Sequence, residues 1–325
     1  MTSARAGIAL DDATFGPMTE PLRRDLLLHC YRFSGSLTEA EDLVQETLAN
    51  AWRGRAGYRG EAGLRTWLRR IATRVCLDAL RSRRRTMPSS VGEPSSSAGE
   101  VLWLDPLPEH LLADVDADPA AAYDLRESVS LAFLTALQRL PARQRAVLLL
   151  RDVLAMRASE VAEQLDVTES AVTSLLYRAR RTMEANGARP GTSRPFDDAT
   201  ASLLDAYVAA WQSGDVDRLL ALLKRDAILE MPPIAFAPIG HAAIRAFLAD
   251  GILDGNAQRW LGVPITANGG PAAAMYEQTP EADRFIGVHL LAIDGEAIAV
   301  VTAFMDPGLA ARFEVPAILA RTAGS

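Results

Sequence analysis

The sequence predicts a multidomain chain in which two all-helical domains are followed by an α+β domain. Apolar residues recur at helical spacing through 20–85 and again from about Pro119 to Met183. Segments rich in proline, glycine and serine follow each helical stretch. Beyond Asp197 the pattern changes to helices and then to short apolar runs typical of strands.

We therefore expect six segments along the chain. They are an N-terminal tail over 1–19, a helical bundle over 20–85, a linker over 86–120, a helix-turn-helix domain over 121–185, a second linker over 186–196 and an α+β domain over 197–320.

The last of these segments has the most detailed pattern. Its sequence predicts helices at 199–212, 215–225 and 241–249, a strand at 227–231, and further strands at 257–267, 271–277, 284–293 and 296–304. Asp294-Gly295 separates the last two runs and indicates a hairpin.

Charge is distributed unevenly, although the formal net charge is only −7. Residues 65–85 carry eight arginines and one acidic residue, and residues 131–195 carry ten arginines and six acidic residues. Residues 86–130 carry nine acidic residues and one arginine. Two basic modules therefore flank an acidic linker, and basic modules of this kind favour nucleic acid as a partner.

Other sequence features exclude several classes of protein. No apolar run is long enough to span a membrane, and the polar N-terminus shows no secretory signal. Cys30 and Cys76 lie in helical patterns at no metal-ligand spacing, which indicates buried free thiols. We expect a cytoplasmic protein with no metal and no cofactor.

A helix-turn-helix is predicted between Pro141 and Met183. Ser159–Leu165 fits the first helix, which Ser159 is expected to cap, and Asp166–Thr168 fits the turn, with Thr168 capping the second helix. The buried stripe of that second helix consists of Val172, Leu175, Leu176 and Ala179. Its open face, which we expect to contact DNA, consists of Ser170, Thr173, Ser174, Tyr177, Arg178 and Arg181.

Three motifs in order give the chain a resemblance to a known family. Glu39–Thr47 resembles the core-polymerase-binding helix of sigma factors, Leu64–Thr73 their helix for the minus-ten element, and Leu140–Arg145 the start of their minus-thirty-five domain. Over residues 20–85 and 120–184 the chain is thus similar to the extracytoplasmic-function (ECF) sigma-70 family of RNA polymerase sigma factors. This resemblance implies an initiation factor that directs core polymerase to specific promoters.

The resemblance also implies roles for particular residues. The β′ subunit of core polymerase would contact the helix face formed by Asp42, Leu43, Gln45 and Glu46, and the β subunit is a further expected partner. The minus-ten element would contact Arg65, Arg69, Arg70, Arg74, Arg81 and Arg84. Arg74 stands where relatives often have asparagine, and Trp67 is interpreted as a core residue. The acidic linker would thread the channel through which RNA leaves the polymerase.

Five short motifs of the C-terminal segment are Ala206–Trp211, Gly214-Asp215, Met231–Pro233, Ala267–Gly269 and Ala303–Pro307. With them the segment resembles the SnoaL-like, NTF2-type cone domain that one ECF subgroup carries. Trp103–Pro108 is similar to a motif in the linker of that subgroup, and we expect this apolar patch to dock on a partner surface, the alternative being a local contact with the next helix. A pocket between sheet and helices would be lined by Tyr207, Trp211, His241, Trp260 and His289.

Three roles for this domain remain open. It could regulate the sigma modules in cis, sense a small-molecule ligand, or act as a small-molecule isomerase, cyclase or hydrolase. No catalytic residue is assigned, because no nucleophile motif supports one, and the sequence leaves open whether a separate anti-sigma protein exists.

Overall fold

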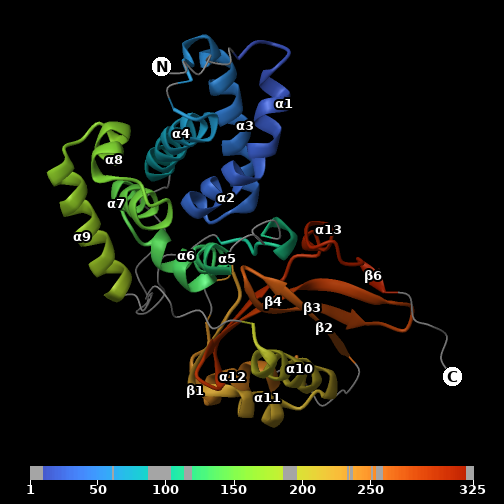
Figure 1. Cartoon of the computed structure of the whole chain (residues 1–325). Coiled ribbons are helices and arrows are strands. Elements are labelled where there is room, and N and C mark those ends of the chain that lie inside the picture. Colours follow the sequence, from blue (N-terminus) through green and yellow to red (C-terminus); the bar gives the residue numbers. More distant parts are fainter. Residues whose placement is uncertain are drawn as a thin grey trace. The chain divides into compact units, whose positions relative to one another are not determined.

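The computed structural model describes residues 10–60, 62–86, 104–112, 119–185, 196–232, 234, 237–249, 252–253 and 259–319 (Figure 1). Contacts divide the chain into two compact units, one made of Met1–Glu93 with Leu134–Ala188 and the other of Pro94–Phe133 with Arg189–Ser325. Within the described part, no helix is long and apolar enough to cross a membrane. The two units are described separately below.

The first unit begins with a bundle of helices. The elements are α1 (Phe15–Thr19), a 3-10 turn at Glu20–Leu22, α2 (Arg23–Ser34), α3 (Leu37–Gly54), a 3-10 turn at Arg55–Gly57 and α4 (Leu64–Thr86). Helices α2, α3 and α4 pack on one another through buried side chains such as Leu26, Leu43 and Leu68. This confirms the predicted helical bundle.

Part of the segment that we expected to be a tail is folded onto this bundle. Leu10 and Phe15 are buried, and the Phe15 ring meets the Trp52 ring edge to face at a centroid distance of 5.2 Å. Burial of an aromatic side chain is worth about 2 kcal/mol or more. Residues 10–19 are therefore part of the bundle, whereas residues 1–9 lie outside the described part.

The rest of the first unit is the predicted helix-turn-helix. It contains α6 (Leu131–Gln138), α7 (Ala142–Leu148) with a π-helical turn at Leu149–Val153, α8 (Ala158–Leu165) and α9 (Glu169–Ala185). Asp166 takes the left-handed conformation in the turn, with φ 53°, and Thr168 Oγ1 accepts a bond of 3.2 Å from the Ala171 N–H.

The start of α8 differs from our expectation that Ser159 would cap it. The helix begins one residue earlier, at Ala158, after Arg157 in extended conformation. The carboxylate of Glu160 turns back and accepts a bond of 2.7 Å from the Arg157 N–H. A glutamate at the third helical position thus stabilises this helix end, as in half of a capping box.

The second unit contains the predicted α+β domain, which is confirmed. Its elements are a 3-10 turn at Glu109–Leu111, α5 (Pro119–Glu127), α10 (Asp198–Ser213), α11 (Val216–Leu222), β1 (Leu223–Glu230), α12 (Gly240–Ala249), β2 (Trp260–Ala267), β3 (Gly270–Gln278), β4 (Asp283–Asp294), β5 (Ala297–Phe304), α13 (Leu309–Arg312) and β6 (Ile318–Leu319). The strand order is β1-β5-β4-β3-β2, with β6 paired to β4. Only β1 and β5 run parallel among these pairs.

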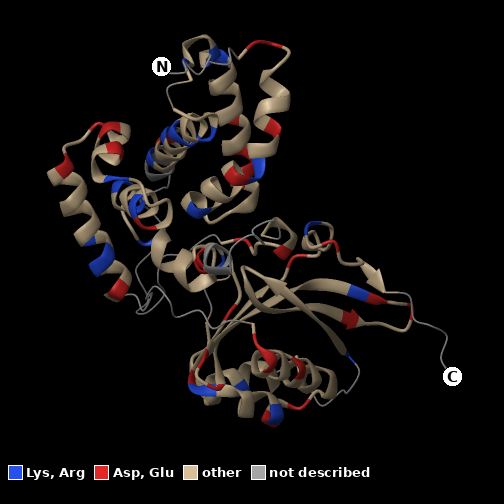
Figure 2. Cartoon of the chain, viewed as in Figure 1, with Lys and Arg blue, Asp and Glu red and all other residues tan. Residues whose placement is uncertain are grey.

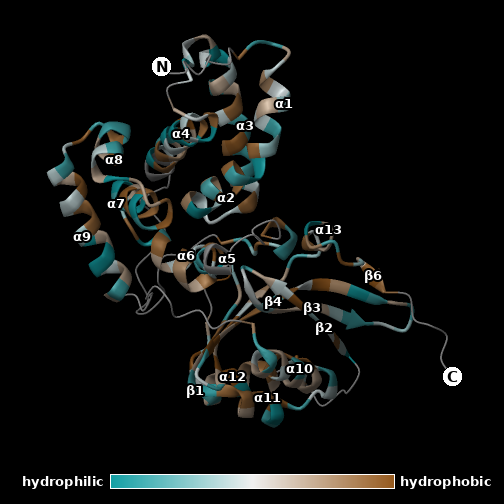
Figure 3. Cartoon of the chain, in the orientation of Figure 1, coloured by the Kyte–Doolittle hydropathy of each residue, from teal (hydrophilic) through white to brown (hydrophobic). Residues whose placement is uncertain are grey.

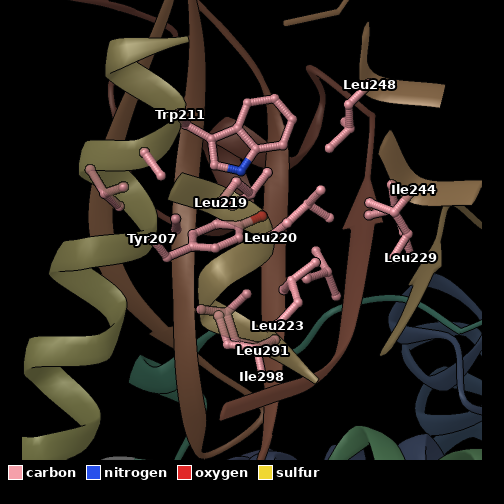
Figure 4. Packing of buried hydrophobic residues seen from close by; sticks show 14 of the residues in the cluster. Tyr207, Trp211, Leu219, Leu220, Leu223, Leu229, Ile244, Leu248, Leu291 and Ile298 are labelled. Atoms are coloured by element: carbon pink, nitrogen blue, oxygen red, sulfur yellow. The ribbon is translucent and has the colours of Figure 1, made fainter. Parts of the chain in front are cut away.

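Helices α10, α11 and α12 lie against one side of this sheet, and apolar positions predominate along the strands (Figures 1 and 3). The core between them is built from helix side chains such as Tyr207, Trp211 and Leu220 and from strand residues such as Leu291 and Ile298 (Figure 4). At Asp294-Gly295 the chain makes the predicted hairpin, with Gly295 at φ 65°.

Helix α5 was predicted to belong with the helix-turn-helix. Its contacts instead place it in the second unit, as they do the preceding residues 104–112. The division between the units falls inside α6, so this segment and the α+β domain share one folded unit.

Candidate nucleic-acid interface

Helix α9 presents the predicted open face to solvent. Val172, Leu176 and Ala179 are buried, whereas the opposite face is exposed and consists of Ser170, Thr173, Ser174, Tyr177, Arg178 and Arg181. Tyr177 is 63% exposed, and the Arg181 guanidinium lies 5.9 Å from the centre of its ring. Figure 2 shows basic residues in the second half of this helix. The face offers hydroxyls, an aromatic ring and two cations, which suit base edges and phosphates.

The arginines of α4 fall into two groups. Arg65, Arg74 and Arg81 are exposed, although Arg81 also pairs with Asp78 at 2.7 Å. Arg69, which we predicted to contact DNA, is instead half-buried and forms an ion pair with Asp25 of α2. Its Nε donates to Asp25 Oδ2 at 2.8 Å, and its Nη2 donates to Asp25 Oδ1. We therefore assign Arg69 a structural role. Arg84 lies in α4, but its side chain is outside the described part.

The ion pair of Arg69 belongs to a buried polar seam between α2 and α4. His29 Nε2 lies 3.0 Å from Thr73 Oγ1, and both residues are buried. Burial, and secondarily the nearby cations Arg69 and Arg32, lowers the pKa of His29 to about 3. The seam therefore holds a neutral imidazole beside charged groups, which fixes how α4 packs on α2.

A hollow of about 460 Å³ lies between α3, the 3-10 turn after it and α4. Trp67 lines it and is only half-buried, with its ring 5.1 Å from that of Tyr58, so it is not the core residue that we expected. Aromatic, aliphatic and charged groups therefore meet in this hollow. The hollow is lined by Glu46, Asn50, Gly54, Gly57, Trp67, Ile71, Arg74, Val75 and Asp78.

The predicted polymerase-binding face of α3 is exposed at three of its four positions. Asp42, Gln45 and Glu46 face solvent. Leu43 is 6% exposed and packs in the bundle core, so it does not belong to this face. Leu43 is turned by about 100° from Asp42 around the helix, which points it toward the bundle.

Four of the five predicted pocket residues meet inside the α+β domain. The Trp211 ring lies 5.1 Å from that of His289 and 6.2 Å from that of Trp260, and the Tyr207 hydroxyl lies 2.9 Å from His289 Nδ1. His241 does not join them, because it lies in the first turn of α12 and its Nε2 contacts the Leu223 carbonyl at 3.1 Å.

Figure 4 shows Tyr207 and Trp211 among the apolar side chains of this interior. The cavity beside Tyr207 and Trp211 has about 10 Å³ of free volume, roughly the space of a single water molecule. Burial lowers the pKa of His289 to about 4 and raises that of Tyr207. Within the described residues, no group of His, Cys, Asp and Glu could hold a metal ion.

A further group of contacts, centred on Asn268, connects the linker to the α+β domain. Asn268, which is 4% exposed, accepts a bond of 2.7 Å from the Leu107 N–H and donates one of 2.7 Å to the Val129 carbonyl. Its own N–H donates to the Leu107 carbonyl at 2.8 Å. Leu107 is completely buried. The predicted docking of this patch is on the end of the sheet, where Leu107 bonds to Asn268 and Pro108 forms a bridge with Ala267, and Trp103 lies outside the described residues.

We did not predict the role of Asn268, although the sequence carried a signal for its position. Asn268-Gly269 forms the turn between β2 and β3, with φ 52° and 71°. Asn-Gly between two apolar runs is a strong hairpin signal, because both residues tolerate positive φ. A side chain at such a turn projects beyond the end of the sheet, where the linker passes.

A helix-turn-helix with an exposed polar face, together with a basic helix beside a hollow, is typical of a protein that binds DNA. The Sigma-70 region 2 family matches residues 18–86, the Sigma-70 region 4 family residues 130–183, and the SnoaL-like domain family residues 204–301.

Comparison with characterised relatives shows the family. The chain is 43% identical over 314 residues to the ECF RNA polymerase sigma factor SigG of Mycobacterium tuberculosis H37Rv, covering 93% of this chain and 84% of that one. It is 33% identical over 228 residues to SigJ of the same strain, covering 70% and 67%. The chain belongs to the ECF family of RNA polymerase sigma factors.

A solved structure shows a similar fold. The crystal structure of Mycobacterium tuberculosis SigJ matches with a TM-score of 0.60 at 22% identity, over 93% of this chain and 99% of that chain. We call residues 18–86 region 2, residues 130–183 region 4 and residues 197–320 the cone domain. As a sigma factor, the protein acts in transcription initiation with core RNA polymerase and promoter DNA.

Proposed function

We propose that regions 2 and 4 hold two promoter elements for core polymerase, and that the cone domain regulates this activity in cis by holding the linker between them. The observation that carries the proposal is the set of bonds from Asn268 to Leu107 and Val129. Asn268 of the cone domain is thereby bonded to two residues, Leu107 and Val129, of the segment that joins the promoter-binding regions.

In the proposed holoenzyme, each region has its own partner. Asp42, Gln45 and Glu46 bind the β′ subunit through an acidic helix face. The minus-ten element meets α4, with Arg65, Arg70, Arg74 and Arg81 contacting phosphates or bases. The exposed face of α9 reads the minus-thirty-five element in the major groove. A cytoplasmic location follows from these partners.

Regulation through the linker is consistent with its charge. Residues 86–130 carry nine acidic side chains and one arginine, which suits a channel built for RNA. While Leu107 is buried and bonded to Asn268 of the cone domain, the same stretch is kept from that channel. Release of the linker therefore accompanies activation.

The cone domain supports regulation better than catalysis. Among the described residues, the cavity beside Tyr207 and Trp211 has about 10 Å³ of free volume, roughly the space of one water molecule. A ligand sensor would require this interior to open. Binding of the linker needs no such change, because the bonds are already formed.

Transcription by purified protein and core polymerase tests the proposal. Asn268→Gly keeps the positive φ of the turn and deletes the side-chain bonds, and we expect it to raise promoter-specific transcription several-fold. A chain truncated after Pro195 should also exceed the full chain. Equal transcription by all three proteins would rule out regulation in cis. Asp42→Arg should abolish polymerase binding and serves as the negative control.

A further inference from the structure

Residues 10–19, which we call the N-terminal arm, pack on the end of α3 that leads to α4. Leu10 and Phe15 of the arm are buried. The Phe15 ring meets the Trp52 ring at an interplanar angle of 78°, with 5.2 Å between the ring centres. Trp52 lies in the last turn of α3, which ends at Gly54. Burial of apolar side chains therefore anchors the arm at this end of the helix.

Arg55, the first residue after α3, connects the arm to the same helix end. Its Nη2 donates to Asp12 Oδ1 at 2.7 Å, and its Nη1 donates to the Trp52 carbonyl at 2.9 Å. The guanidinium carbon lies 3.8 Å from the centre of the Trp52 ring, which is the geometry of a cation–π contact. Trp52 therefore contacts both Phe15 and Arg55, and Asp12 bonds the guanidinium to the arm.

The Trp52 carbonyl explains why a cation is favoured at this place. The last four carbonyls of an α-helix have no partner within the helix, and they carry the negative end of its dipole. Arg55 donates to the Trp52 carbonyl with its backbone N–H as well as with Nη1. The helix end and the arm together thus fix the position of the Arg55 side chain.

The 3-10 turn that begins with Arg55 forms a wall of the hollow between α3 and α4. Gly54 and Gly57, one on each side of this position, both line the hollow. A Cβ atom at either glycine would meet no atom within 4 Å, so close packing does not require glycine there. Glycine leaves the backbone more conformational freedom than other residues do. The conformation of the turn therefore depends on contacts made by its other residues, and Arg55 makes them.

A second series of contacts leads from Arg55 to α4. The Tyr58 N–H donates to the Arg55 carbonyl at 3.1 Å, and the Tyr58 hydroxyl donates to the Ala62 carbonyl at 3.1 Å. The Tyr58 ring lies 5.1 Å from the ring of Trp67, which lines the hollow together with Arg74. Arg55 is therefore connected to two sides of the hollow, the turn and Trp67.

We propose that the N-terminal arm is a positioning element of region 2: through Phe15 and Asp12 it holds the turn at Arg55–Gly57, and it thereby keeps the hollow beside Arg74 in the shape that promoter opening requires. The inference rests on the proposed contact of the minus-ten element with α4. It goes beyond that contact, because Asp12 and Phe15 precede residue 18, where the match to the Sigma-70 region 2 family begins.

Fluorine resonances of tryptophan test these contacts in the full-length protein without DNA. Fluorotryptophan replaces all five tryptophans, and the variants Trp52→Phe and Trp67→Phe assign the two resonances. Asp12→Asn and Phe15→Leu should shift both resonances, because the arm contacts Trp52 directly and Trp67 through the turn. Glu20→Gln makes the same change of charge at an exposed position next to the arm and should shift neither.

Promoter opening by the holoenzyme tests the consequence. Permanganate footprinting follows the rate of opening on a promoter that the parent holoenzyme transcribes. Asp12→Asn should slow opening by about 2- to 5-fold, which corresponds to the loss of an exposed ion pair. Phe15→Leu should slow it by about 10-fold, since displacement of a contact group by about 1 Å costs up to about 100-fold. Affinity for core polymerase should stay at the parent level, which shows that region 2 is folded.

A double-mutant cycle tests whether Asp12 acts through Arg55. Arg55→Gln should slow opening more than Asp12→Asn does, because it also removes the cation from the Trp52 ring. Adding Asp12→Asn to Arg55→Gln should cause no further slowing, since the partner of the carboxylate is already lost. Independent effects that multiply in the double variant would overturn the assigned contact.

Arg74→Ala distinguishes failure of the arm from failure of the proposed promoter contact. If Arg74→Ala slows opening while Asp12→Asn and Phe15→Leu open at the parent rate, the proposal for the arm is overturned. If Arg74→Ala has no effect, the proposed minus-ten contact is wrong, and the Trp67 resonance still decides whether the arm holds the hollow. A parent-like Trp67 resonance in both arm variants would by itself overturn the proposal.

Discussion

The hydroxyl of Tyr207 on α10 and Nδ1 of His289 on β4 lie 2.9 Å apart in a core with almost no free volume. Both side chains are fully enclosed, and burial holds both in their neutral forms. The pair therefore resembles a packed structural contact. Because His289 is held neutral, the pair should make the stability of the domain depend on pH.

We expect the cone domain to lose stability as the pH falls from about 6.5 to 4. The folded domain keeps His289 neutral, with a pKa of about 4 rather than the ordinary 6.5, whereas the unfolded chain binds a proton in this range. The full difference amounts to about 3 kcal/mol and levels off below pH 4. Denaturant unfolding at several pH values measures it.

His289→Gln is the matching variant, because glutamine does not titrate. The difference in unfolding free energy between parent and variant should shrink with acidification. This comparison distinguishes the contribution of His289 to the pH dependence from that of other groups such as His29. His241→Gln serves as the control outside the Tyr207 cluster. A pH-independent difference for His289→Gln would contradict the assignment.

The Asn268 contacts predict a change in stability as well as in regulation. Asn268→Gly removes two buried side-chain bonds and leaves the Leu107 N–H and Val129 carbonyl unsatisfied. We expect a loss of about 2–4 kcal/mol from the second unit. Limited proteolysis should cut residues 104–112 faster in the variant.

Comparison with a second variant separates two effects at the Asn268 turn. Asn268→Ala should cost more than Asn268→Gly, because alanine tolerates φ 52° poorly. Equal proteolysis rates for the parent and Asn268→Gly would show that the side chain does not hold the linker.

Two neighbouring arginines of α9 should differ in promoter binding. Arg178→Ala should weaken holoenzyme binding to the promoter about 10-fold or more, since a base or phosphate contact is worth about 1–3 kcal/mol. Arg180→Ala removes the same charge, but Arg180 pairs with Asp152 at 2.7 Å inside region 4. Electrophoretic mobility shift at two salt concentrations compares them. An equal loss for both variants would indicate a general charge effect.

Arg69 and Arg74 lie five residues apart on α4, and their alanine substitutions should show defects in different assays. Arg69→Ala leaves Asp25 without its bidentate partner and should destabilise region 2 by about 1–3 kcal/mol. Arg74→Ala should leave the melting temperature unchanged and impair promoter opening, because Arg74 lines the hollow beside Trp67. Permanganate footprinting measures opening. A drop in melting temperature for Arg74→Ala would refute this division of roles.

Much of the local structure could be predicted from sequence, because it depends on short-range patterns. The stripe of Val172, Leu176 and Ala179 fixed which side of α9 is buried, and hence its exposed face. Asp166 and Thr168 supplied the turn and cap at their predicted positions. Alternating apolar runs with Asp294-Gly295 likewise predicted the hairpin.

Charged and aromatic side chains were harder to assign, because their roles depend on distant partners. Arg69 looked like one of several equivalent arginines until Asp25, 44 residues away, proved to bind it. Leu43 shares the polar segment of α3, but its direction is set by packing against the bundle. Among the pocket residues, His241 was separated from Tyr207 and His289 by the path of α12.

By itself, the sequence determined the order of the domains, the helix-turn-helix and the family, since periodicity and motif spacing are properties of the chain. Only the tertiary structure decided that Asn268 bonds to Leu107, that Arg145 bonds to Phe33 and that Tyr207 meets His289. Each of these contacts joins residues separated by 82 to 161 positions. Such pairs meet because packing satisfies buried donors and acceptors wherever the folded chain brings them together, which no local pattern records.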